Sequence, residues 1–257
     1  MDDDLLLPEV RAAHGIAQQR RRGGKPALSL NRIVDAAMAL ADEDGLAAVS
    51  MARVAARLGY TTMSLYRHVG SKDELLAHMQ DAGLPRPPAD LAATTDWRTG
   101  LRRWTEAQAA AAIDRPWVLD IPVTGPPLMP NSLAWMEAAM SLMAELPLSG
   151  MEKIALLTLL AGHARSEATT TVNMRRAYAE RGIGAEDEGP LYERAMLRLT
   201  ADGRFPLLHA MAAAGELFSM PPGVADEDAD AYYASFPIER ILDGVAAYVA
   251  GDQAVGS

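Results

Sequence analysis

Apolar residues recur at helical spacing along most of the chain, and no stretch alternates between apolar and polar residues with the period of two that a half-buried strand needs. From Leu30, for example, Ile33, Val34, Ala37 and Met38 fall on one face of a helix. The 257 residues contain no cysteine, which excludes a disulfide framework and a Cys-ligated metal site. The pattern therefore predicts an all-α fold.

Beyond the first 85 residues, only helical patterns are predicted. They cover approximately Trp97–Ile113, Ser132–Leu146, Met151–Glu180, Leu191–Thr200, Pro206–Phe218 and Tyr232–Ala250. The sequence Ser149-Gly150-Met151-Glu152 has the form of a capping box and marks the start of the longest helix. The Pro-rich segment at residues 85–88 follows a predicted helix and indicates a boundary.

We therefore expect four parts in the chain. Residues 1–28 form a flexible basic arm, residues 29–84 a small helical module, residues 85–250 a larger helical domain, and residues 251–257 a flexible tail. No run of apolar residues is long enough to span a membrane, and the N-terminus lacks the positive start of a secretory signal. The expected location is the cytoplasm.

Charge is distributed unevenly along the sequence. The chain holds 24 Lys and Arg against 34 Asp and Glu, a formal net charge of −10. Between Arg11 and Lys72, however, ten basic residues stand against four acidic ones. A basic segment in an acidic protein is compatible with a polyanionic partner for that segment alone, and equally with chance clustering of arginine.

Two short helices separated by a glycine are predicted within this basic segment. Ser50 is a good N-cap for the first, Gly59 ends it, and the second begins at Tyr60–Thr62 and runs through His68. Ser71-Lys72-Asp73-Glu74 is a capping box that starts the next helix. Two short helices joined by a tight turn describe a helix-turn-helix, in which the second helix enters the major groove of DNA.

The sequence from Ser50 to Leu76 resembles the DNA-binding module of the tetracycline-repressor (TetR) family, most specifically in its Leu-Tyr-x-His-Val-x-Ser-Lys-Asp-Glu-Leu-Leu segment. The resemblance covers about residues 29–82. It implies an N-terminal helix-turn-helix module followed by a larger helical domain that binds a small effector and dimerises. It also implies binding to palindromic operator DNA and release from DNA when the effector binds.

The resemblance assigns a set of expected DNA contacts by position: Ser50, Arg53, Thr61, Thr62, Met63, Ser64, Tyr66, Arg67, His68 and Lys72. Ser50, Arg53 and Lys72 fall where family members touch phosphate. Thr62, Met63 and Ser64 are the expected base readers. Ala52 replaces a base-reading arginine of some relatives, so fewer base contacts are expected there. Tyr66 and His68 also suit a structural role, and Arg53 also suits a solvated surface.

The expected effector-binding residues lie in the larger domain. All four tryptophans fall between residues 97 and 135, next to a Pro-rich connection, and methionines follow on one side of the next helix. His163 and Glu167 are four residues apart on the longest helix. The expected set is Trp104, Trp117, Trp135, Met136, Met140, His163, Glu167 and Thr170, and an ordinary core role remains open for each.

The leading hypothesis is therefore a homodimeric, ligand-responsive repressor. A ligand-independent regulator controlled by a protein partner remains a second candidate, and a helical enzyme using the C-terminal pocket a third. No nucleotide-binding loop, nucleophile elbow or metal-ligand cluster is present in the sequence. We accordingly expect no enzyme activity, cofactor or metal.

Overall fold

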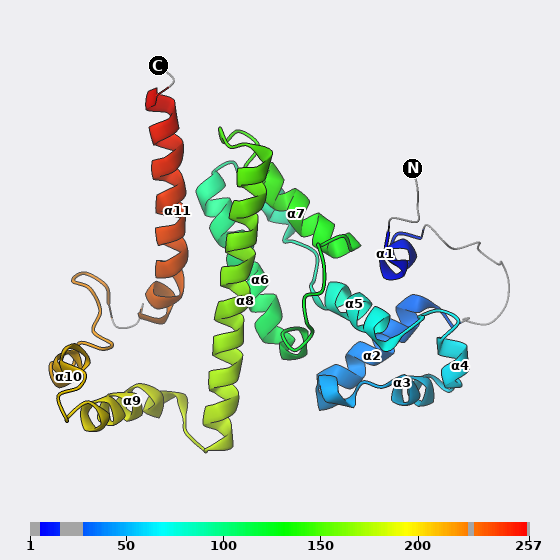
Figure 1. Ribbon diagram of the computed structural model, residues 1–257, viewed down its shortest axis with the longest axis horizontal. Helices are drawn as coiled ribbons and strands as arrows, with labels where there is room; N and C mark the ends of the chain where they lie inside the picture. The colour runs from blue at the N-terminus through cyan, green and yellow to red at the C-terminus, as the bar shows by residue number, and fades with distance from the viewer. Residues whose placement is uncertain (1–5, 16–27, 226–228, 256–257) are drawn as a thin grey trace. The chain divides into compact units, whose positions relative to one another are not determined.

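The computed structural model describes residues 6–15, 28–225 and 229–255, and within them every regular element is helical. The all-α prediction is confirmed. Figure 1 shows the helices in chain order. The longer elements are α2 (Leu30–Asp44), α5 (Lys72–Gly83), α6 (Trp97–Asp114), α7 (Pro130–Leu142), α8 (Gly150–Glu180), α9 (Ala185–Leu199) and α11 (Ala229–Val255). The shorter ones are α1 (Pro8–Ala13), η2 (Leu46–Ala48), α3 (Met51–Leu58), α4 (Thr62–Leu65), η3 (Ala89–Ala93), η4 (Pro116–Val118) and α10 (Pro206–Ala213).

The N-terminal segment differs from the expected flexible arm. Residues Pro8–Ala13 form α1, which starts with proline at its first position, where the missing N–H costs nothing. Val10 is buried, α1 packs against α5, and the His14 ring bonds the Leu128 carbonyl at 2.8 Å. The helix is too short for a periodic pattern, which is why the sequence did not predict it. The basic run at residues 20–25 lies outside the described residues.

Several helix ends also differ from the sequence prediction. Helix α9 begins six residues earlier than expected and continues through Pro190, because Glu186, Asp187 and Glu188 favour a helix start at their position. Helix α7 ends at Leu142 and α10 at Ala213, both earlier than predicted. Helix α11 includes Pro237 and reaches Val255, into the expected tail.

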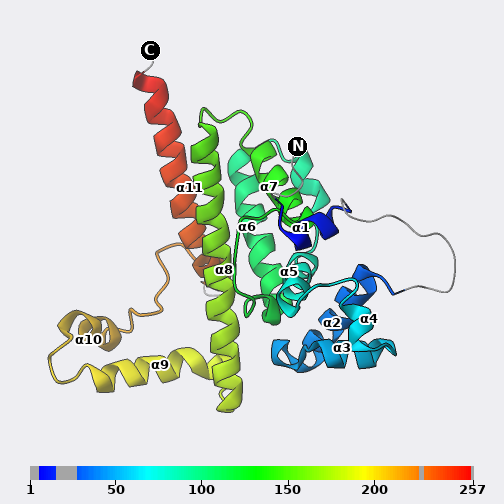
Figure 2. The ribbon, with the colours of Figure 1, turned by 45° about the vertical axis from the view of Figure 1, so that its right-hand side comes forward.

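The chain divides into two compact units, residues 1–169 and 170–257. Within the first unit, residues on both sides of position 84 share one core. Trp117, Val118 and Ile121 are buried together with the apolar faces of α2, α3 and α5. Figure 2 shows α2, α3, α4 and α5 grouped within this first unit.

Asp81 of α5 makes the most extensive polar connection between the two expected domains. Its buried carboxylate accepts hydrogen bonds from the backbone N–H of Asn131 and of Ser132 and from the Ser132 hydroxyl, at 2.9–3.1 Å. The Asn131 amide donates in return to the backbone carbonyls of Asp81 and Leu84. Asp81 thus caps the start of α7 from another helix, which fixes the direction of α7 relative to α5.

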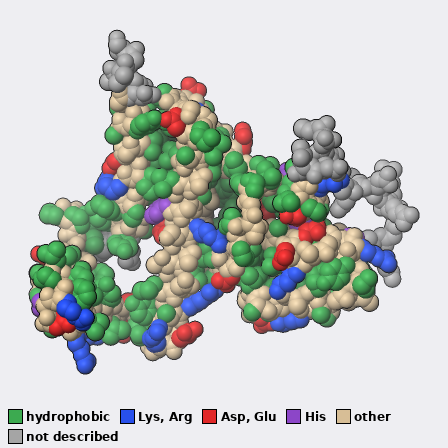
Figure 3. All heavy atoms as spheres, viewed as in Figure 1, with side chains coloured by type: hydrophobic (Ala, Val, Ile, Leu, Met, Phe, Trp, Pro, Cys, Tyr) green, Lys and Arg blue, Asp and Glu red, His purple; other side chains and the backbone are tan. Residues whose placement is uncertain are grey.

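The second unit contains α9, α10 and α11. Thr200 is buried after α9, and its hydroxyl lies 3.0 Å from Nδ1 of His209 on α10, which holds these two helices together. Ile238 and Leu242 are buried, and they are the buried residues in the part of α11 whose side chains the structure describes. Apolar side chains are exposed over α9 and α10, as Figure 3 shows. They include Leu199, Phe205, Leu207 and Leu208. Within the described residues, no helix combines the length and the apolar character that crossing a membrane requires.

Candidate nucleic-acid interface and effector-binding helices

Helix α3 is positioned by its local sequence. Met51, Val54 and Ala55 are buried against the core, and the Ser50 hydroxyl accepts a hydrogen bond from the Arg53 backbone N–H at 3.2 Å. Gly59 ends the helix in the left-handed conformation (φ 73°, ψ 31°), which glycine adopts without a steric penalty. The N-cap and the glycine turn predicted from the sequence are confirmed.

Helix α4 is shorter than predicted, because only Thr62–Leu65 are helical. Thr61 is its N-cap: its Oγ1 accepts from the Ser64 backbone N–H and lies 3.0 Å from the Ser64 hydroxyl. Thr61 and Ser64, two of the expected DNA contacts, therefore also hold the start of the helix, and Ser64 is the one of them that was expected to read bases. Met63 is 70% exposed and extends from the helix without a cap role, whereas Thr62 is half-buried.

The polar residues after α4 lie in the turn that leads to α5. Tyr66, Arg67 and His68 are exposed, while Leu65 and Val69 are fully buried and anchor the turn. Lys72, the first residue of α5, is exposed. The start of α5 has the predicted capping contacts, with a shift of one residue: Ser71 Oγ accepts from the Glu74 N–H, and Glu74 accepts from Gly70 N–H at 2.7 Å.

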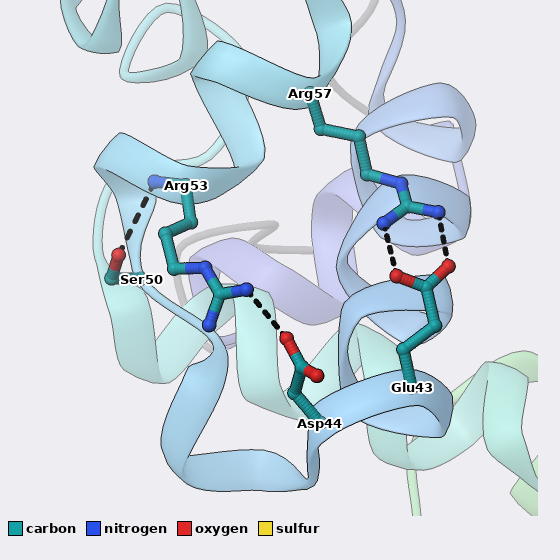
Figure 4. A network of polar contacts seen from close by, with 5 residues as sticks. All are labelled: Glu43, Asp44, Ser50, Arg53 and Arg57. Carbon is teal, nitrogen blue, oxygen red and sulfur yellow. Dashed lines mark hydrogen bonds and ion pairs between the residues drawn. The ribbon is translucent and has the colours of Figure 1, made fainter.

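Two ion pairs join α3 to the end of α2 (Figure 4). Arg57 makes two hydrogen bonds to the Glu43 carboxylate, at 2.7 and 2.5 Å, and Arg53 makes a 2.6 Å bond to Asp44. The hydrogen bond from Arg57 lowers the pKa of Glu43 and raises that of Arg57. Both arginines are thus neutralised by carboxylates within the module, an arrangement that the sequence did not predict.

The expected effector-binding tryptophans have different environments. Trp104 and Trp135 are buried in a T-shaped pair with ring centroids 5.9 Å apart. Their indole N–H groups donate to the carbonyls of Trp135 and Pro85. Trp117 lies elsewhere, in the core shared with α2 and α5, and its indole nitrogen donates to Asp42 at 2.6 Å. Trp117 thus has a structural contact, in keeping with the core role that the sequence left open for it.

The remaining candidates lie on α7 and α8. Met136 and Met140 are half-buried. Nε2 of His163 is 3.8 Å from the Glu167 carboxylate, too far for a hydrogen bond, and this buried nitrogen has no partner within the described part of the chain. Thr170 is exposed and belongs to the second unit.

Gln108 on α6 is a candidate that sequence reasoning missed. Its Nε2 is buried and, like His163 Nε2, lacks a hydrogen-bond partner among the described residues. A buried amide N–H without a partner is costly, so such groups frequently face a ligand or water. The signal in the sequence was a single polar residue in the alanine run of residues 107–112. No group of three or more His, Cys, Asp or Glu side chains in the described residues is arranged to hold a metal ion.

The capped α3, the left-handed glycine and the short α4 with its exposed side chain define a helix-turn-helix protein. Comparison with protein families agrees. Residues 33–79 match the model described as bacterial regulatory proteins, tetR family. Residues 85–249 match the tetracyclin repressor-like C-terminal domain.

Relatives extend the match over most of the chain. The chain is 34% identical over 238 residues to the HTH-type transcriptional repressor DrrR1 of Streptomyces coeruleorubidus, covering 89% of this chain and 81% of that protein. It is also 34% identical over 110 residues to an HTH-type transcriptional regulator of Saccharopolyspora erythraea, covering 43% of this chain and 47% of that protein. The chain belongs to the tetR family of bacterial transcriptional regulators.

Solved structures show the same fold. Apo ActR of Streptomyces coelicolor superposes with a TM-score of 0.67 at 23% identity, covering 89% of this chain and all of that one. ActR in complex with actinorhodin superposes with a TM-score of 0.65 at 24% identity, covering 87% and 99% of the two chains. The family assignment from the sequence is confirmed, and so is the N-terminal helix-turn-helix with a helical domain after it.

Proposed function

We propose that this regulator represses transcription by binding palindromic operator DNA as a homodimer, and that a small effector bound by its helical domain releases it. The observation that carries the DNA-binding part is the geometry of α3 and α4. Both helices have a side-chain N-cap, and Val54, Leu65 and Val69 are buried in the core beneath them. The remaining side chains of α3, α4 and the turn that follows are left largely exposed. The named relatives are regulators, which supports this role over that of an enzyme.

The residues of this interface divide by the kind of contact they can make. Met63 is the most exposed side chain of α4 and suits apolar contact with a thymine methyl group, while Thr62 and Ser64 suit polar contact with base edges. Phosphate contact suits the polar residues at the start of α3 and between α4 and the first residue of α5. These are Ser50, Arg53, Tyr66, Arg67, His68 and Lys72. Thr61 belongs to this set through its cap, which orients Ser64.

Homodimer formation is supported by exposed apolar faces on two long helices, each taken separately. On α8, Met151, Ile154 and Leu159 are exposed, and Gly162 continues the same face with open space beside it. On α11, Tyr233 and Tyr248 are exposed. A second copy of the chain would cover these faces, as burial of apolar surface requires. The variant Leu159→Arg should give monomers in sedimentation velocity, and Val123→Arg, an exposed loop position, should not.

Effector binding is supported by the buried polar atoms that lack partners. Nε2 of Gln108 and Nε2 of His163 can each form a hydrogen bond with a polar group of a bound molecule. Apolar side chains on α6 and α7 would supply the rest of the binding surface, namely Trp104, Trp135, Met136 and Met140. Glu167 lies one turn further along α8, with a carboxylate oxygen 3.8 Å from Nε2 of His163. ActR, which shares the fold, has been crystallised with actinorhodin, so that compound is a reasonable first probe.

The proposed function is tested by selecting bound sequences from a random DNA library, followed by titration of actinorhodin against the selected complex. An enriched inverted repeat with half-sites about 34–36 Å apart is the expected result for a dimeric reader. Failure of any sequence to be enriched would contradict operator recognition. An enriched sequence whose complex does not respond to actinorhodin would leave DNA recognition intact and exclude this compound as the effector.

A further inference from the structure

The exposed ion pairs between α2 and α3 bear on how the module binds DNA. Between residues 29 and 84 the sequence has five basic residues and seven acidic ones, so this part of the chain is negative overall. Two of the five, Arg53 and Arg57, are bonded to carboxylates of α2. A module with a negative net charge can attract phosphate only through local positive groups. Its affinity for DNA therefore depends on which of these groups are not already paired with carboxylates.

The two pairs differ in geometry. Arg57 binds Glu43 with both of its terminal nitrogens, which is the more specific and stronger arrangement of arginine with a carboxylate. Arg53 makes a single 2.6 Å bond to one oxygen of Asp44, and both side chains are about half exposed to solvent. Exposed pairs of this kind contribute little stability, so Arg53 can exchange its partner at small cost.

Arg53 also lies where a phosphate would meet the module. It is the third residue of α3, and its backbone N–H bonds the Ser50 cap, so the guanidinium extends from the first turn of that helix. Figure 4 shows Ser50, Arg53 and Asp44 beside one another, and the pair of Arg57 and Glu43 one turn further along α3. The Asp44 carboxylate is thus already paired with the guanidinium that would bind a DNA phosphate.

We propose that Asp44 competes with DNA phosphate for Arg53 and so sets the affinity of the module for the DNA backbone, while Glu43 holds Arg57 as a link between α2 and α3. The proposal rests on the proposed function, since it requires that Arg53 contacts DNA. In the free protein Arg53 is neutralised. On DNA the phosphate replaces Asp44, and the negative charge of the released carboxylate opposes binding.

A double-mutant cycle on DNA affinity tests this competition. The cycle uses the full-length protein, Asp44→Asn, Arg53→Gln and the double variant, with the selected operator and an unrelated duplex of equal length as probes. Asp44→Asn should tighten binding to both duplexes several-fold and steepen the dependence of log K on log salt. In the Arg53→Gln background the same change should tighten binding only by the general effect of removing one negative charge, the effect that the control measures, because the competition for Arg53 no longer exists.

The control is Asp35→Asn, which removes the same charge from an exposed position of α2. It reports the general effect of charge, which should be equal in both backgrounds. Arg53→Lys serves as a second variant, since it keeps a phosphate-binding charge and should retain part of the coupling. Circular dichroism and thermal melts identify any variant that fails to fold.

Two outcomes would overturn the proposal. If Asp44→Asn tightens binding equally with and without Arg53, its effect is one of long-range charge. If it leaves binding unchanged, Asp44 and phosphate do not compete. Failure of the proposed function is distinguishable from both, because the wild-type protein would then enrich no sequence from the library.

Discussion

The indole nitrogen of Trp117 donates a 2.6 Å hydrogen bond to the carboxylate of Asp42, joining η4 to the C-terminal part of α2 across 75 residues of sequence. From the other side, Arg165 of α8 donates to the backbone carbonyls of Leu119 and Ile121, at 2.7 and 3.1 Å. The segment around η4 is therefore bonded both to the helix-turn-helix module and to the longest helix.

Replacing Trp117 with phenylalanine should lower the free energy of unfolding by about 1–3 kcal/mol. The variant loses a hydrogen bond to a charged group and part of a buried ring, while Asp42 remains accessible to water. Chemical denaturation of the wild type, Trp117→Phe, Asp42→Ala and the double variant gives the coupling between the two side chains. Strictly additive effects would show that the hydrogen bond contributes nothing to stability.

The contrast between this contact and the helix caps shows what the sequence could predict. Ser50, Gly59 and Ser71 act on backbone groups within four residues of themselves, so their roles follow from local sequence. The partner of Trp117 is on another helix, and nothing near Trp117 distinguishes a core position from a ligand wall. For the same reason the sequence did not predict the pairing of Arg53 and Arg57 with α2, or the unpartnered amide of Gln108.

Helix α1 and the domain boundary show a second limit. A helix of six residues has no repeating apolar pattern, and its stability comes from packing against α5. The Pro-rich segment at residues 85–88 follows the end of a helix, as predicted, but local sequence does not reveal that Asp81 and Trp117 connect residues on its two sides. Local signals therefore predict where a helix ends more reliably than which distant residues pack together.

Replacing Gly59 with alanine should destabilise the protein by about 1 kcal/mol. Open space surrounds the position of an added Cβ, so the cost comes from the backbone, which has φ 73°. Gly150→Ala is the matched control, because that glycine also has open space and lies at the start of α8 without a positive φ. Thermal melts in which the two variants lose equal stability would contradict this explanation.

Stability should fall in mild acid because of His78. Burial lowers the pKa of this side chain in the folded protein, and the carboxylates of Glu74, Glu9 and Asp81 oppose that effect only in part. The unfolded chain takes up a proton at about pH 6.5, before the folded protein does, so the free energy of unfolding decreases as the pH falls through that range. The contribution of His78 is constant at higher pH.

His78→Gln should flatten the pH dependence of stability that this side chain causes. Denaturant titrations of both proteins between pH 7.5 and 5 measure the difference, which should grow toward acid. The substitution does not remove the hydrogen bond from the Gly70 N–H to the neighbouring Glu74 carboxylate, because neither residue is replaced. Parallel curves for the two proteins would show that His78 does not cause the acid sensitivity.

Replacing Lys72 with alanine should weaken DNA binding on every sequence. The side chain is exposed at the first position of α5 and can contact only the backbone of DNA in the proposed complex. The slope of log K against log salt should become less steep by about 0.9, the value for one phosphate contact. Fluorescence anisotropy on the operator and on an unrelated duplex measures both, and an unchanged slope would remove Lys72 from the phosphate contacts.

Replacing Met63 with alanine should change which bases are preferred and leave the salt dependence as it is. The side chain is 70% exposed and carries no charge, so it can contribute through apolar contact at a base edge but not through release of counterions. A mismatched base pair in a recognised site costs about 1–3 kcal/mol, and the variant should lose a preference of at most this size at one position of the operator. Repeating the library selection with the variant identifies that position, and Ala47→Ser, an exposed change in η2, is the control for a general effect of the surface. An identical preferred sequence for Met63→Ala and the wild type would mean that α4 reads bases through other side chains.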